Sequence, residues 1–158
     1  MFNRIWVLAF ILIVGSGQSL AQPGQKTATI SRVNALTGRL VKIAKHRTAH
    51  RRDPIGMSLA GAIDRLLQNE SDPDVLARVA LISNVYLHPG SAGDEAVDEV
   101  FEVAWGACVR RIEQIGGQPA IDALENIRQN MRLDGSLSMT LSSATERLKA
   151  KQGAVGTP

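Results

Sequence analysis

The sequence predicts an all-α fold of about six helices in a single domain, packed as stacked helical hairpins or as an irregular bundle. Apolar residues recur at three- and four-residue steps along most of the 158-residue chain, which places them on one face of a helix. Proline and glycine interrupt this spacing and mark turns between the helices. The two-residue alternation that is typical of half-buried strands does not compete with this pattern.

The N-terminal residues 1–21 have the pattern of a secretory signal peptide. A basic start, MFNR, precedes the apolar run IWVLAFILIV, and Ser19 and Ala21 occupy the small-residue positions that signal peptidase requires. A membrane-spanning helix would need about 20 apolar residues, so an uncleaved anchor is the less favoured alternative. We expect a mature chain that begins at Gln22 and is exported to the periplasm or the extracellular space.

The remainder of the chain divides into a helical domain with short ends. We expect residues 22–28 to be flexible, residues 29–151 to form the all-helical domain, and residues 152–158 to form a disordered tail. The first helix follows from one apolar stripe, which consists of Ile30, Val33, Leu36, Leu40, Ile43 and Ala44. This helix should end near Lys45 to Thr48, because Arg47 and Arg51 would otherwise project into the apolar stripe.

The next two helices have similar start signals. Asp53-Pro54 and Asp72-Pro73 each place an aspartate at the N-cap and a proline at the first helical position. The helix predicted to start at Asp53-Pro54 continues through the segment MSLAGAIDRLL. The second leads into a helix whose apolar side holds Val75, Leu76, Val79, Ile82 and Tyr86. The following HPGSAG is a loop by its proline and glycine content.

Three helices follow in the C-terminal half. A long helix runs from about Asp94 to Ile115 and ends at Gly116-Gly117. The next begins at Pro119 and breaks at Asp134-Gly135. Its inward positions are Ile121, Leu124, Ile127 and Met131. The last helix has an apolar side formed by Leu137, Leu141, Ala144 and Leu148.

Residues 71–87, SDPDVLARVALISNVYL, resemble the second helix of a HEAT or armadillo-type repeat. The resemblance implies stacked helix pairs. A shared pattern, A-I-D-x-L, occurs at residues 62–66 and 120–124 and suggests helical hairpins on both sides of the long helix. A period of about 40 residues, which a solenoid requires, does not extend along the chain.

Charge is strongly polarised along the sequence. Residues 22–52 contain eight Lys/Arg and no acid, whereas residues 53–108 contain ten acids and only Arg65 and Arg78 as cations. Helical geometry of about 100° per residue places the basic and acidic residues opposite the apolar stripes of their helices. The candidate interaction residues are Arg32, Arg39, Lys42 and Lys45 in the first helix, and Asp94, Glu95, Asp98, Glu99 and Glu102 in the long helix.

These two charged sets have alternative interpretations. The acids lie near a helix N-terminus, where the helix dipole stabilises them, so they are first of all a solvated helix start. They could also form a docking surface for a basic partner or for the basic helix of this same chain. The basic residues could contact another protein, or an anionic membrane surface, to which each cation contributes about 1 kcal/mol.

The motifs of catalysis and of cofactor or metal binding are missing, so we expect no catalytic residue, no cofactor and no metal. In IAKHRTAHRRD, His46 and His50 have only Asp53 nearby as a third ligand, and the surrounding cations would repel a divalent ion. The single cysteine, Cys108, lies on the apolar side of its helix, which indicates a buried, inert thiol. An intermolecular disulfide is the minor alternative.

We therefore predict an exported, non-catalytic interaction protein of the adaptor, inhibitor or immunity type, with another protein as its partner. A peripheral membrane or polyanion binder is the alternative, and an enzyme with an unrecognised site ranks third. Nucleic acid is disfavoured as a partner because the mature chain has few aromatic residues for base stacking, namely Tyr86, Phe101 and Trp105. The sequence does not indicate an oligomeric state.

Overall fold

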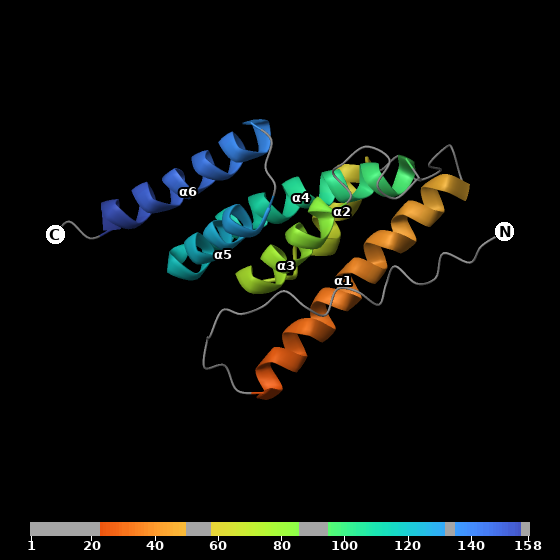
Figure 1. Ribbon diagram of the computed structural model, residues 1–158, viewed down its shortest axis with the longest axis horizontal. Coiled ribbons are helices and arrows are strands. Elements are labelled where there is room, and N and C mark those ends of the chain that lie inside the picture. The colour runs from red at the N-terminus through yellow and green to blue at the C-terminus, as the bar shows by residue number, and fades with distance from the viewer. Residues whose placement is uncertain (1–22, 50–57, 86–94, 132–134, 156–158) are drawn as a thin grey trace.

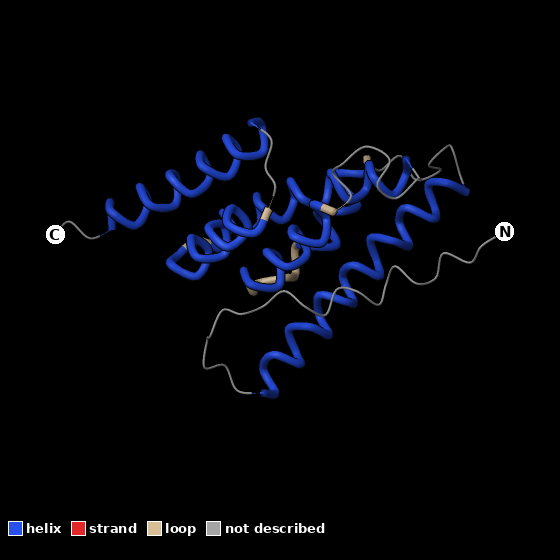
Figure 2. Tube along the Cα trace, viewed as in Figure 1, coloured by secondary structure: helices blue, strands red, loops and turns tan. Residues whose placement is uncertain are grey.

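The computed structural model describes residues 23–49, 58–85, 95–131 and 135–155, and these residues form a bundle of six helices (Figure 1). The helices are α1 (Pro23–Ala49), α2 (Leu59–Leu67), α3 (Pro73–Asn84), α4 (Glu95–Ile115), α5 (Gly117–Asn130) and α6 (Gly135–Val155). No strand occurs in these described ranges (Figure 2). The predicted all-α class is confirmed.

Helix α4 is the centre of the bundle, because it contacts each of the other five helices. Helices α1 and α6 lie on opposite sides of it and do not contact each other within the described part of the chain (Figure 1). Helices α5 and α6 form a contacting pair, whereas α2 and α3 have no close backbone contact with each other along their lengths. Of the two predicted arrangements, the irregular bundle describes this packing better.

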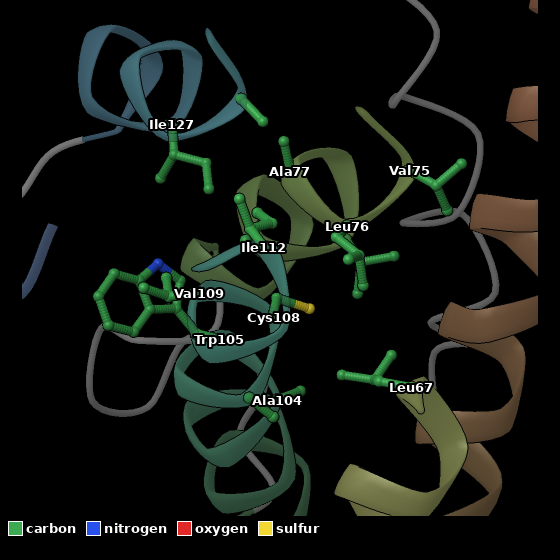
Figure 3. Packing of buried hydrophobic residues seen from close by; sticks show 14 of the residues in the cluster. Leu67, Val75, Leu76, Ala77, Ala104, Trp105, Cys108, Val109, Ile112 and Ile127 are labelled. Atoms are coloured by element: carbon green, nitrogen blue, oxygen red, sulfur yellow. The ribbon is translucent and has the colours of Figure 1, made fainter. Parts of the chain in front are cut away.

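The hydrophobic core is built largely from the apolar stripes that the sequence predicts, but Ile30, which belongs to the predicted first stripe, is 46% exposed. Leu40, Leu76, Leu124 and Leu141, from four different helices, are fully buried. Figure 3 shows how α4 supplies this core in two directions: Cys108 faces Leu67 and Leu76, while Trp105 lies on the side of Ile127. The contribution of α4 consists of Val100, Phe101, Ala104, Trp105, Ala107, Cys108, Val109 and Ile112.

Local capping signals determine several helix ends. Asp72 is the N-cap of α3, where its Oδ1 accepts a hydrogen bond from the Asp74 N–H at 3.0 Å, and Pro73 follows at the first helical position. Between α4 and α5, Gly116 and Gly117 have φ angles of 73° and 76°. Residues with a side chain rarely adopt this left-handed conformation, so glycine ends α4 at the predicted place.

The start of α2 differs from the prediction. The helix begins at Leu59, with Ser58 as N-cap accepting from the Gly61 N–H at 3.2 Å. The Asp53-Pro54 signal lies outside the described residues. Ser58 has extended backbone angles, so α2 is not a continuation of a helix from Pro54. A serine cap directly before the apolar spacing therefore defines this helix.

Helices also extend beyond both predicted ends of the helical domain. Helix α1 begins at Pro23, so residues 23–28, which we expected to be flexible, are helical. Helix α6 continues through Val155, beyond the expected limit at residue 151. Apolar spacing reports only the part of a helix that is buried, and backbone hydrogen bonds continue the helix past its last core contact.

Ion pairs attach α6 to the rest of the bundle. Arg147 donates to both carboxylate oxygens of Glu113 in α4, at 2.6 and 2.9 Å, and Lys149 donates to Glu125 in α5 at 2.9 Å. The Arg147 hydrogen bond lowers the pKa of Glu113 below its ordinary value of 4.5. Likewise, the Lys149 hydrogen bond lowers the pKa of Glu125.

This pair should make the contribution of Arg147 to stability dependent on pH. Because the pKa of Glu113 is lower in the folded than in the unfolded chain, the stabilisation is present above about pH 4.5 and is lost as the pH falls through the folded-state pKa. Urea unfolding at pH 7 and pH 3 should therefore show Arg147→Gln to be destabilising only at pH 7. Arg65→Gln, an exposed arginine without an ion pair among the described residues, is the control and should show no such change. An effect of Arg147→Gln that is equal at both pH values would contradict a stabilising ion pair between Arg147 and Glu113.

Candidate interaction surfaces

Three of the four basic candidates form an exposed surface on α1. Arg39, Lys42 and Lys45 are exposed, while Leu40 and Ala44 on the other side of the helix are fully buried. The three cations make no ion pair with any residue in the described part of the chain. We call Arg39, Lys42 and Lys45 the basic face.

Arg32, the fourth basic candidate, has a different environment. Its guanidinium pairs with Glu70 and, at 3.2 Å, with Asp72, which lie in the turn between α2 and α3. Glu70 is only 8% exposed and also accepts a hydrogen bond from the Asp72 N–H at 2.9 Å. Arg111 of α4 donates to the Glu70 carbonyl at 3.0 Å. Arg32 therefore joins α1 to the α2–α3 turn, and it is not part of an unpaired surface.

The acidic candidates lie along the first half of α4. Glu95, Glu99 and Glu102 are exposed and Asp98 is half-buried, whereas Asp94 lies outside the described residues. Although α1 contacts α4, no ion pair within the described ranges joins Glu95 or Glu102 to Arg39, Lys42 or Lys45. In the part of the chain that the structure describes, Glu95 and Glu102 are therefore not linked to the basic face by ion pairs.

The histidine-rich segment and the cysteine offer no metal site in the described residues. His46 is exposed, but His50 and Asp53 lie outside these residues. Within the described ranges, no three His, Cys, Asp or Glu side chains are grouped so that they could hold a metal ion. Cys108 is fully buried, and this burial raises the pKa of its thiol to about 12.

The buried thiol should be inert in the native protein. At pH 8 the thiolate is the species that iodoacetamide attacks, and both burial and the raised pKa of Cys108 suppress it. We expect no carbamidomethylation of the folded protein within about an hour at pH 8, and complete modification in about 6 M guanidinium chloride. Mass spectrometry measures both. Rapid modification of the native protein would place the thiol at the surface.

A polar depression lies between α2 and α4. It has a volume of about 290 Å³, and it is lined by Asp64, Arg65, Leu67 and Gln68 from α2 and by Ala107, Arg110, Arg111 and Gln114 from α4. We call it the arginine depression. Sequence reasoning missed it because its two halves lie on helices that are far apart in the chain. The available signal was that polar residues recur at a step of four on each helix, namely Asp64 with Gln68 and Arg110 with Gln114.

Comparisons with known proteins returned no match to a family model, to a curated protein or to a solved structure. Among the described helices, none combines the length and the apolar character that crossing a bilayer requires. A functional assignment for this chain therefore depends on its own residues and surfaces.

Proposed function

We propose that this chain is an exported, non-catalytic interaction protein that binds an acidic surface of another protein through the basic face of α1. The observation that carries the proposal is the exposure of Arg39, Lys42 and Lys45 without an ion-pair partner in the described residues. By contrast, several cations on other helices are engaged within the chain, as the pairs of Arg110 with Asp64 and of Arg147 with Glu113 show.

The arrangement of α1 favours a protein over a membrane as the partner. A helix that binds a bilayer inserts an apolar face below the headgroups. In α1 the apolar residues Val33, Leu36, Leu40 and Ala44 are buried in the core, so they are not available for insertion. The basic face therefore offers charge and hydrogen-bond donors, which match carboxylates on a folded partner. An adaptor, an inhibitor or an immunity protein would use such a surface.

Export is a separate part of the proposal and is supported by the sequence of residues 1–21, which lie outside the described residues. Basic, apolar and small residues follow one another there in the order of a signal peptide. Mass spectrometry of the exported protein should find an N-terminus at Gln22. A product that retains Met1 to Ala21 would contradict this part of the proposal without affecting the binding surface.

The binding proposal is tested by comparing two charge-matched variants in a pull-down from an exported-protein fraction. The first, R39Q/K42Q/K45Q, removes the basic face. The control, R78Q/R128Q/K151Q, removes the same charge from α3, α5 and α6. A specific partner should be retained by the wild type and the control. Its affinity for the first variant should fall roughly threefold to 100-fold, since three exposed pairs contribute about 0.2 to 1 kcal/mol each.

Two results would contradict the binding proposal. The first is equal capture by all three proteins. The second is equal loss from both variants, which would indicate a general charge effect. Anionic vesicles provide the comparison with the membrane alternative: salt-sensitive vesicle binding by the wild type that only R39Q/K42Q/K45Q loses would favour the membrane as the partner.

A further inference from the structure

We propose that the arginine depression between α2 and α4 binds a small phosphate dianion, either free phosphate or the phosphate group of a monoester. The site is separate from the basic face of α1 and does not depend on the proposed function. Its lining contains three guanidinium groups, from Arg65, Arg110 and Arg111, and one carboxylate, from Asp64. The resulting net charge of the lining complements a phosphate, which carries about −1.5 to −2 charges at pH 7.

Two of the arginines are held in place before any ligand binds. Arg111 donates through Nε to the Glu70 carbonyl at 3.0 Å and through Nη1 to Gln114 Oε1 at 3.3 Å. Arg110 donates through Nη2 to Asp64 Oδ1 at 3.1 Å. These bonds leave Nη2 of Arg111, and Nε and Nη1 of Arg110, without a partner among the described residues. Groups that are already ordered lose less conformational entropy when they bind.

Gly106 contributes to the position of Arg110. A Cβ atom at residue 106 would lie 3.5 Å from Arg110 Nη1, so the guanidinium lies close along the surface of α4 at the place where glycine has no side chain. The side chain of Arg110 is therefore directed back over the preceding turn of the helix, which is the usual direction for a long helical side chain.

Arg65 supplies the remaining positive charge. It is exposed and makes no ion pair in the described part of the chain, so its guanidinium can move onto a ligand. Arginine forks match the oxygens of phosphate with two parallel hydrogen bonds. The side-chain amides of Gln68 and Gln114 add further donors at the same depression.

The size and lining of the depression select the class of ligand. A volume of about 290 Å³ is at the lower end of the range for small-molecule sites, about 300 to 1,000 Å³. Leu67 and Ala107 are its apolar lining residues, and both are buried. A small polar anion fits this combination, whereas a flat aromatic cofactor would find no aromatic or extended apolar surface.

The test is an NMR titration of the isotope-labelled mature protein with inorganic phosphate and with glycerol phosphate, at ionic strength held constant with NaCl. Saturable shifts are expected at the side-chain amides of Gln68 and Gln114 and at the arginine Nε–H groups, with a Kd of about 1 mM or below for at least one ligand. The tighter ligand identifies the source of the phosphate. Binding should weaken at pH 5, where phosphate is a monoanion.

Arg65→Gln should weaken this binding about tenfold, corresponding to the loss of about 1.4 kcal/mol. Because Arg65 has no packing or ion-pair role in the described residues, the variant should fold normally. Arg128→Gln, an exposed arginine on α5, is the matched control and should bind like the wild type. The proposal is overturned if neither phosphate produces saturable shifts up to about 10 mM, or if Arg65→Gln and the control bind equally. R39Q/K42Q/K45Q should bind phosphate normally, which separates this site from the basic face.

Discussion

Phe101→Ala is expected to lower the free energy of unfolding by about 3 to 5 kcal/mol. Phe101 is fully buried in α4, the helix that contacts all the others, so the loss of its ring would leave a cavity in the hydrophobic core. Equilibrium unfolding in urea, followed by circular dichroism at 222 nm, measures the change. Leu124→Ala should cost about 2 to 5 kcal/mol by the same mechanism, because Leu124 is also fully buried.

Met139→Ala is the control for these core substitutions. Its side chain is 71% exposed, so the free energy of unfolding should change by no more than about 0.5 kcal/mol. A loss of less than about 1 kcal/mol for Phe101→Ala would place its ring at the surface and would contradict the central position of α4.

Arg32→Gln should lower the free energy of unfolding by about 1 to 3 kcal/mol. The substitution leaves the buried carboxylate of Glu70 without its guanidinium partner, and the exposure of Arg32, 45%, keeps the expected loss below that of a fully buried pair. A double-mutant cycle with Glu70→Gln measures the interaction free energy between Arg32 and Glu70. The double variant should be less destabilised than the sum of the single variants.

Arg39→Gln is the matched control for the Arg32 cycle. It removes the same charge from the same helix, but Arg39 makes no ion pair in the described residues, so its effect should stay within about 0.5 kcal/mol. If Arg32→Gln and Arg39→Gln had equal effects, then Arg32 would have no special structural role, and all four basic residues would again form one surface.

This distinction corrects the sequence-based expectation for the four basic residues. Helical geometry places all four residues opposite the apolar stripe, which predicts that they form one exposed surface. Arg32 does lie at the surface, but it reaches Glu70 and Asp72. A variant that includes Arg32 would therefore change stability and binding together, whereas R39Q/K42Q/K45Q isolates binding.

Local signals explain which parts of the fold could be predicted. Asp72-Pro73 and Gly116-Gly117 act through the chain's own backbone, so their effects can be read from the sequence. The first residue of α2 was harder to predict, since Asp53-Pro54 and Ser58 are both N-cap signals and lie only a few residues apart. Packing of Leu59 against the core is a tertiary contact that local sequence does not report.

The difference between local signals and tertiary contacts also explains why the basic face could be predicted from the sequence and the arginine depression could not. Helical periodicity alone gives the outward direction of Arg39, Lys42 and Lys45, because their helix buries one regular stripe. The arginine depression instead requires α2 and α4 to lie side by side, with Asp64 and Arg110 meeting across 46 positions of sequence. Periodicity within one helix carries no information about that juxtaposition.

Zero-length carbodiimide cross-linking in an intact exported-protein fraction, followed by mass spectrometry, tests the binding role of α1 most directly. The reagent joins lysine amines only to carboxylates that they already contact. We predict cross-links from Lys42 or Lys45 to aspartate or glutamate residues of another protein. These cross-links should decrease when Arg39 is changed to glutamine and be lost when salt is raised to about 1 M. Cross-links from these lysines only to Glu95, Asp98, Glu99 or Glu102 of the same chain, or none at all while Lys149 and Lys151 react with other proteins, would contradict the proposed function.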